Sequence, residues 1–306
     1  MKNKFISIFS IAIVLMIVIF SFAEVVNDYM PYYIDYYKIE KNCPGNDELC
    51  KPFKNRAEVL EYLENKNPHK KFDAITLSTY VIETSSTFGL VVFLLPLIVI
   101  INVVFRIHDE ISSGFIKNKL SRMSYSKLLR EYFLKAMKVS LIIPLIYIFI
   151  FGISCLITNF NFNITENMQL FSEYETFKYS NFFIYSVLLI IIQYLLFFGY
   201  SIIGIFMSFI NKSKIVSVIF GYIYFVILCI FYLVFGTVVI KNLLGINYGE
   251  VNYFNLIGNY WSFNDLASPV LLLMVVLSVV VFNVLITLKL AGSKEKGILW
   301  YERQRT

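Results

Sequence analysis

The sequence of 306 residues lacks the groups on which most enzymes depend. It has two histidines, His69 and His108, and neither belongs to an HExxH or similar paired-ligand pattern, so we predict no metal site. It has no GxSxG nucleophile motif and no phosphate-binding P-loop, so this chain alone should not hydrolyse ATP. No nucleic-acid-binding motif accompanies the net charge of +6. We therefore expect neither an enzyme nor a nucleic-acid-binding protein.

Charged side chains are also missing from six long apolar runs, which are residues 5–23, 85–105, 139–158, 182–210, 215–240 and 267–288. A helix rises about 1.5 Å per residue, so about 20 residues cross a hydrocarbon core of about 30 Å. The sequence therefore predicts an all-α integral membrane protein with six transmembrane helices.

The same lack of charge bears on how such a protein could be energised. A transporter coupled to protons or ions usually needs an ionisable relay inside the membrane, and these runs contain no Asp, Glu, Lys or Arg. We therefore expect the energy for transport to come from elsewhere.

Basic residues gather in alternate connections between these runs. With both ends and every second connection on one side, that side has 17 Lys and Arg and 5 Asp and Glu, whereas the other side has 10 and 16. Lys and Arg are retained on the cytoplasmic face, so we expect both termini in the cytoplasm. The long segment 24–84 counts little towards orientation, and without it the basic residues divide 17 against 2. Anionic lipids of the bilayer and a soluble protein partner explain this charge without a nucleic acid.

The abundance of Phe and Tyr, with 30 and 22 residues, is typical of proteins from AT-rich genomes. We interpret the chain as a multi-pass protein of a bacterial plasma membrane.

The first run can also be interpreted as a secretory signal peptide. Lys2 and Lys4 precede it, and Ser21-Phe22-Ala23 resembles a small-x-small cleavage site. A run of 19 residues is longer than the usual apolar region of a signal peptide, so we expect the span to be retained. Cleavage would leave five spans and place the new amino terminus outside.

Residues 24–84 form the longest polar segment, and we expect a small extracytoplasmic domain after the first helix. It can serve as a cap over the bundle or have a direct role in substrate binding or sensing. Cys43 and Cys50 bracket the turn-rich residues 44–49 on the oxidising side of the membrane, which predicts a disulfide. Loop-closure entropy gives it a stabilisation of about 2.5 kcal/mol. The alternative of a metal site is weaker, because the spacing does not suit a zinc knuckle and only His69 can assist.

Few polar residues lie inside the spans. We interpret Gln193 and Asn283 as interhelical contacts, with substrate binding as the alternative. Gly199 and Gly204 permit either close packing or a break in the run 182–210.

The connection 106–138 contains the most specific pattern. Ile111, Phe115 and Ile116 can share one face of a short helix. Lys117 and Lys119 would then turn to solvent. Such an interfacial helix can place its apolar side chains in a groove of a soluble subunit, or it can lie on anionic lipid.

This connection resembles a segment of ABC-2 type transporter permeases. In that family an acidic residue is followed by Ser/Thr-Gly, a short Lys-containing helix, a Ser-Arg-Pro-like turn and Ser-Lys-Leu-Leu. The matching positions here are Glu110, Gly114, Lys117, Ser121, Arg122, Ser126 and Lys127. Met123 stands where many members have Pro. The six spans extend the resemblance over nearly the whole chain.

The resemblance implies one ABC-2 type transmembrane domain over residues 1–306, with an extracytoplasmic insertion at 24–84 and a cytoplasmic loop at 106–138. The coupling helix in this loop would receive the motion of a separate ABC ATPase, and its implied residues are Glu110, Ile111, Gly114, Phe115, Ile116 and Lys117. ATP and Mg would be bound by that partner, and no cofactor by this chain.

The resemblance also implies a homodimer, or a heterodimer with a similar permease, and re-entrant helices within 242–268. Two departures leave the subfamily open. Many relatives have a longer helix before the first span, and some place their large outer domain between the fifth and sixth spans.

The sequence thus predicts the permease subunit of an ATP-driven exporter. Its cargo would be hydrophobic or amphipathic, with an antimicrobial peptide or a drug as the first candidates. The alternative is a non-transport membrane sensor or immunity protein whose outer domain binds a ligand.

Overall fold

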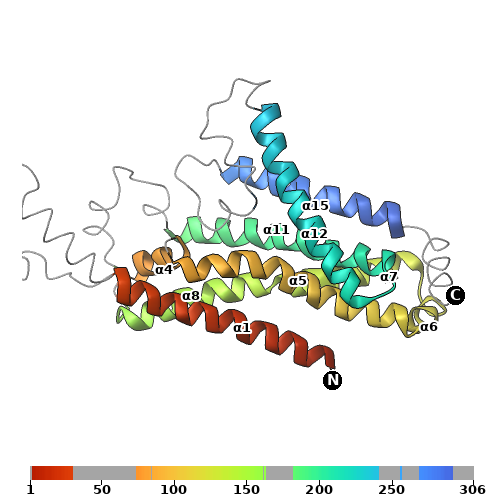
Figure 1. Ribbon diagram of the computed structural model, residues 1–306, viewed down its shortest axis with the longest axis horizontal. Coiled ribbons are helices and arrows are strands. Elements are labelled where there is room, and N and C mark those ends of the chain that lie inside the picture. Colours follow the sequence, from red (N-terminus) through yellow and green to blue (C-terminus); the bar gives the residue numbers. More distant parts are fainter. Residues whose placement is uncertain are drawn as a thin grey trace, which may run out of the picture. The chain divides into compact units, whose positions relative to one another are not determined.

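The structure is a computed structural model that describes residues 2–29, 74–83, 85–160, 162, 182–240, 256 and 269–291. Every regular element in these ranges is a helix (Figure 1). Cys43 and Cys50 lie outside the described residues, as does most of the segment 24–84, so the disulfide and the small outer domain stay predictions. The same holds for the re-entrant helices expected within 242–268, where Leu256 alone is described.

The described elements, in chain order, are α1 (Lys2–Glu24), η1 (Val25–Tyr29), α4 (Ala74–Glu83), α5 (Ser86–Ser112), α6 (Phe115–Leu120), α7 (Tyr125–Ser140), α8 (Ile142–Ile157), α11 (Phe182–Ile210), α12 (Lys214–Val234), η2 (Phe235–Ile240) and α15 (Pro269–Ala291). Six helical segments are long and apolar enough to cross a membrane, and α7 with α8 provides the third of them. The six apolar helices predicted from the sequence are therefore present.

Two of these segments extend beyond the apolar runs. Helix α5 continues from Phe105 to Ser112, and α7 begins at Tyr125, well before the apolar run that starts at Val139. Both extensions carry charges but keep buried apolar residues at helical spacing, as Ile107 and Ile111 do in α5. A search for uninterrupted apolar runs therefore ends α5 too early and begins the third helical segment too late.

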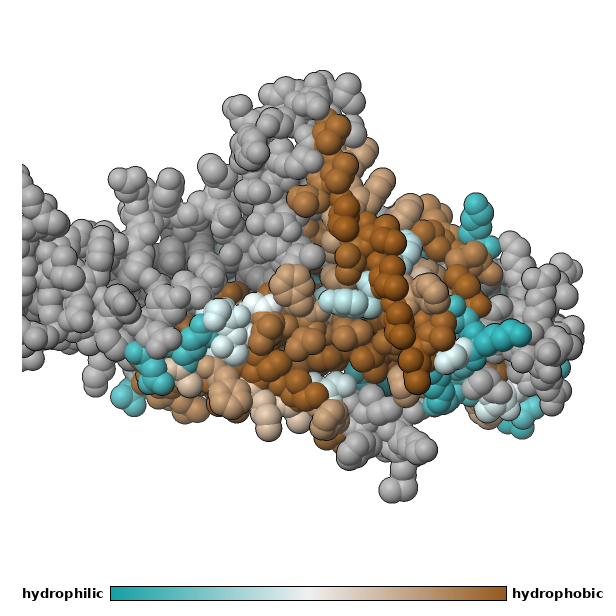
Figure 2. Space-filling model, viewed as in Figure 1, coloured by the Kyte–Doolittle hydropathy of each residue, from teal (hydrophilic) through white to brown (hydrophobic). Residues whose placement is uncertain are grey.

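The exposed side chains of α12 are those expected of a helix in contact with lipid. Large apolar side chains are exposed along its whole length, including Ile215, Phe220, Ile227 and Phe231 at 51 to 67%. Hydrophobic residues accordingly cover most of the described surface that faces the viewer in Figure 2. Because water would strongly disfavour so much exposed apolar area, this surface favours a bilayer environment.

By its internal contacts the chain divides into two compact units. Unit 1 comprises Met1–Leu15, Leu90–Ile148 and Thr176–Thr306, and unit 2 comprises Met16–Gly89 and Phe149–Glu175. In unit 1, α11 packs against α7, α12 and α15, and all its residues from Gly199 to Phe209 are buried.

Two glycines allow the neighbouring helices to approach α11. A Cβ atom added at Gly204 would lie 2.9 Å from Cβ of Val103 in α5 and 3.2 Å from the carbonyl oxygen of Ile100. A Cβ atom added at Gly199 would lie 3.2 Å from Cγ1 of Val279 in α15. Of the two roles that the sequence left open for these glycines, the structure supports close packing.

We expect Gly204→Ala to destabilise the protein by roughly 1 to 3 kcal/mol, because the new methyl group forces α5 and α11 apart. Thermal unfolding in detergent is the measurement. The control is Gly152→Ala in α8, where nothing lies within 4 Å of an added Cβ. Alanine is also the better helix former, so the control should be neutral or slightly stabilising. Equal melting temperatures for the two variants would contradict this packing.

Asn283 joins three helices of unit 1. Its Nδ2 atom in α15 donates to the carbonyl oxygen of Gly199 in α11 at 3.0 Å, and its Oδ1 atom accepts from the Tyr224 hydroxyl of α12 at 3.1 Å. Asn283 thus forms hydrogen bonds between helices, and the alternative of substrate binding stays a prediction. Gln193 is fully buried in α11, and its role stays a prediction.

Within unit 2, Glu24 connects the end of α1 with the start of α5. Its carboxylate accepts from the backbone N–H groups of Ser86 at 3.0 Å and Thr87 at 2.9 Å, and from the hydroxyls of Ser85 and Ser86. A carboxylate at a helix N-terminus satisfies unpaired amides and interacts favourably with the helix dipole. The two ends of the segment between α1 and α5 are thereby held together.

Candidate functional site: the connection between α5 and α7

The connection between α5 and α7 consists of residues 113–124, which include α6, and we call it the α6 connection. Gly114 separates α5 from α6 with a left-handed φ of 73°, a conformation that favours glycine. Ser124 begins α7 by accepting a hydrogen bond from the Lys127 N–H at its side chain. The chain thus turns at both ends of α6.

This geometry differs from the single short helix expected over 111–119. Glu110 and Ile111 belong to the last turns of α5, and α6 begins only at Phe115. Ile111, Phe115 and Ile116 therefore do not share one helical face. A single helix would need Gly114 in a helical conformation. Its positive φ instead interrupts the helix, so α5 ends before Gly114 and α6 begins after it.

An apolar cluster of unit 1 lies beneath the α6 connection. Ile116 of α6 is 3% exposed and packs in one cluster with residues of three other helices: Ile107 and Ile111 of α5, Leu128, Leu129 and Tyr132 of α7, and Ile205 and Phe209 of α11. Phe115 is 48% exposed and leaves its ring on the surface. Helix α6 therefore has a buried anchor and an exposed aromatic side chain next to each other.

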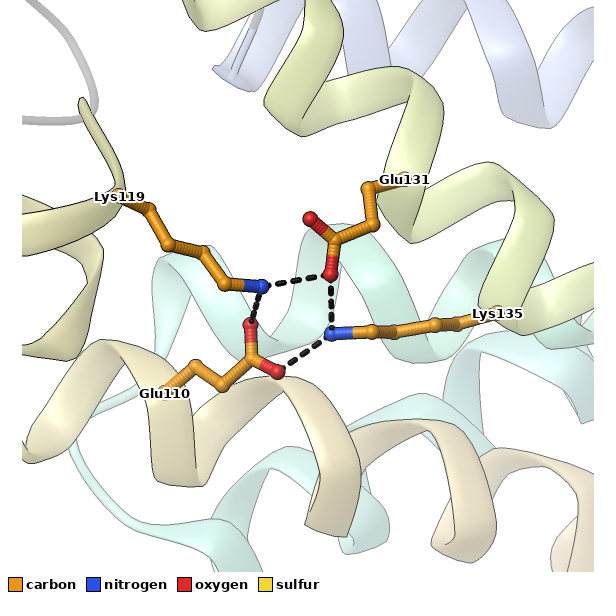
Figure 3. A network of polar contacts seen from close by, with 4 residues as sticks. All are labelled: Glu110, Lys119, Glu131 and Lys135. Carbon is orange, nitrogen blue, oxygen red and sulfur yellow. Dashed lines mark hydrogen bonds and ion pairs between the residues drawn. The ribbon is translucent and has the colours of Figure 1, made fainter. Parts of the chain in front are cut away.

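Four charged residues close a ring over this cluster (Figure 3). Lys119 of α6 contacts Glu110 of α5 at 2.9 Å and Glu131 of α7 at 2.5 Å. Lys135 of α7 contacts the same two carboxylates, Glu131 at 3.0 Å and Glu110 through a short ion pair. Each charge therefore touches two charges of opposite sign, and α6 is fixed to both α5 and α7.

Lys119 is less exposed to solvent than the sequence predicts. Its side chain is only 14% exposed, so the prediction that it turns to solvent is wrong. Burial alone would lower the pKa of Lys119, but hydrogen bonds and charge interactions with Glu131 and Glu110 outweigh that effect and raise it. The ammonium group therefore stays protonated throughout the neutral pH range.

A second set of polar contacts joins the end of α5 to the turn between α11 and α12. Asp109 forms a short ion pair with Lys214, the first residue of α12. Nε2 of the buried His108 lies 3.3 Å from the carbonyl oxygen of Asn211. Together with the ring, these contacts connect the ends of α5, α7, α11 and α12 within unit 1.

The sequence predicts Glu110, Ile111, Gly114, Phe115, Ile116 and Lys117 as residues of this region. It does not predict Glu131, Lys135 or the role of Lys119. Glu131 and Lys135 are four residues apart on one helix, but the other ring partners are separated by 9, 12 and 25 residues and follow no helical period. Lys117 is exposed on α6, as expected.

No group of three or more His, Cys, Asp or Glu side chains among the described residues could hold a metal ion. The carboxylates of the ring, Glu110 of α5 and Glu131 of α7, are neutralised by lysines, which suits a structural or docking role rather than acid–base chemistry. No protein-family model matches the sequence, and neither a curated protein nor a solved structure matches it.

Proposed function

We propose that this protein is the membrane-spanning subunit of an ABC-2 type exporter and that a separate ATPase drives it through α6. The observation that carries the proposal is a short helix with an exposed aromatic side chain, held by four charges to the last turns of α5 and to the middle of α7. The likeness of the segment from Glu110 to Lys127 to the coupling region of such permeases supports it.

The ring suggests how a movement of α6 would reach the membrane. Lys119 is bonded to both α5 and α7, so displacement of α6 pulls on two helices at once. Ile116, buried in the shared cluster, prevents α6 from sliding over its support. Packed elements move as rigid bodies rather than deforming continuously. A partner that pushes α6 would therefore tilt α5 and α7 together.

The orientation is part of the proposal. The α6 connection and both termini would face the cytoplasm of a bacterial cell, and residues 24–84 would lie outside. Two copies, or one copy and a similar permease, would enclose a path for a hydrophobic or amphipathic cargo. ATP and Mg would be bound by the partner ATPase.

Cysteine labelling and cross-linking test the proposal. In cells, Ser121→Cys should react with a membrane-impermeant maleimide only after permeabilisation, whereas Lys66→Cys should react without it. A photo-reactive amino acid at Asn118, which is exposed on α6, should capture a polypeptide with a P-loop. Labelling of Ser121→Cys from outside would reverse the orientation. Capture of a signalling kinase in place of an ATPase would favour the sensor alternative.

A further inference from the structure

We propose that the exposed side of the α6 connection and of the first two turns of α7 binds an acidic surface of a soluble protein that also has a pocket for Phe115. We call this side the basic docking surface and define it by Phe115, Arg122, Lys127 and Arg130. The inference rests on the proposed function, since the partner would be the ATPase, but it adds the chemistry that the partner must present.

The charges of this region are segregated. The segment 106–138 contains three acidic residues, and each is held by lysines: Glu110 and Glu131 by Lys119 and Lys135 in the ring, and Asp109 by Lys214. The acidic charge is thus neutralised locally. What the segment presents to its surroundings is the remaining positive charge.

Six cations of this segment lie outside the ring, and we assign three of them to the docking surface: Arg122, Lys127 and Arg130. All three are exposed, and no acidic side chain among the described residues forms an ion pair with any of them. A cluster of one sign with no local counter-charge attracts a complementary surface and accelerates its association. The partner surface should therefore carry Asp and Glu.

Phe115 supplies an exposed apolar side chain. Its ring is 48% exposed, and Nζ of Lys119 lies 5.6 Å from the ring centroid. An exposed aromatic side chain in a segment rich in cations has the composition of an interface with an apolar core and a polar rim. We therefore expect the acidic residues of the partner to surround a pocket rather than to form a flat patch.

The position of the surface favours a soluble protein over lipid headgroups. The apolar run of α5 ends at Phe105, and its helix continues to Ser112, which at about 1.5 Å per residue places α6 roughly 10 Å farther along the axis. From Tyr125 to Lys138, α7 extends by roughly 20 Å. The headgroup layer on one side is only about 5 to 8 Å thick. The basic docking surface therefore reaches past it.

A binding experiment with a defined acidic probe tests the charge of the expected partner. The full chain in nanodiscs of phosphatidylcholine is titrated with fluorescent poly-L-glutamate at low salt. The triple variant Arg122→Gln, Lys127→Gln, Arg130→Gln should bind at least tenfold more weakly than the wild type. The matched control removes the same charge from exposed lysines outside the basic docking surface, Lys138→Gln in the last turn of α7, Lys212→Gln and Lys289→Gln, and should change binding less than twofold. Equal binding by wild type and surface variant would overturn the proposal.

A spin label at Asn118→Cys tests the lipid alternative. In nanodiscs with phosphatidylglycerol, the label should stay accessible to a water-soluble nickel complex. Strong accessibility to oxygen instead would assign the surface to the membrane and overturn the proposal. If the protein is not an exporter subunit but the surface does bind acidic proteins, the result is different: poly-L-glutamate binds and no ATPase co-purifies. Conversely, an ATPase that co-purified equally with the surface variant at low and high salt would leave the function intact and refute the acidic interface.

Discussion

Phe115→Ala is expected to weaken association with the partner ATPase by roughly 2 kcal/mol or more, about a 30-fold rise in Kd, and to abolish transport-coupled ATP hydrolysis. A desolvated aromatic anchor usually contributes more to an interface than the exposed charges around it. The ring of Phe115 is exposed, so its removal leaves the fold of unit 1 unchanged. The measurement is co-purification with the cognate ATPase, followed by titration of the two purified proteins.

The control for this variant is Asn118→Ala, which changes another exposed residue of the same helix. It should retain nearly the affinity of the wild type, because a solvated polar side chain at the rim of an interface contributes little. Equal affinity of Phe115→Ala and wild type would remove α6 from the docking surface, even if an ATPase binds elsewhere.

Lys119→Met is expected to loosen the α6 connection while the protein still inserts normally. The change leaves Glu110 and Glu131 sharing Lys135 alone, so two carboxylates would face each other with one cation between them. Leaving charges uncompensated at a largely buried site is costly, but the glutamates are 21 and 34% exposed, so we expect roughly 1 to 2 kcal/mol of local destabilisation. Hydrogen exchange of residues 113–124 should therefore accelerate about 5- to 30-fold.

The control is Lys127→Met, whose side chain is exposed and outside the ring. Its exchange in the same segment should match the wild type. The double variant Lys119→Met, Glu131→Gln removes one charge of each sign and should recover part of the loss, which a double-mutant cycle measures. Because the pKa of Lys119 is raised, its contribution is complete in the neutral range and is lost only as the pH rises through that alkaline value. Unchanged exchange in Lys119→Met would show that the ring does not hold α6.

The six transmembrane helices were predictable because apolar runs of about 20 residues are a one-dimensional signal. Their boundaries at α5 and α7 were not, since Ile107, Ile111, Leu128 and Tyr132 are buried between charged residues and do not form an uninterrupted run. In these extensions the apolar residues recur at helical spacing on one face, and charged residues occupy the opposite face. Such a helix is recognised only by a search that accepts charged residues between the apolar ones.

The short helix after α5 was predicted, but its partners were not. The sequence marks Phe115 and Ile116 as apolar among lysines, yet it does not indicate which one is buried; Ile116 is 3% exposed and Phe115 48%. That choice depends on where Gly114 turns the chain and on the position of α7. The pairing of Lys119 with Glu110 and Glu131 depends on the same tertiary arrangement.

The contact between Glu24 and the start of α5 is a further example. About 60 residues separate its partners in the sequence, so no local pattern identifies it. Neither Glu24 at the end of α1 nor the Ser-Ser-Thr sequence at the start of α5 forms a recognisable motif by itself. Glu24 caps α5 only because the fold brings the two segments into contact.

The most direct test of the proposed mechanism is ATP hydrolysis in proteoliposomes that contain this protein and the ATPase that co-purifies with it. The account predicts hydrolysis that depends on the membrane protein and is uncoupled by Phe115→Ala, while Asn118→Ala behaves as the wild type. Full coupling in Phe115→Ala would contradict the role of α6. If no ATPase co-purifies with the wild-type protein, the exporter function itself is refuted.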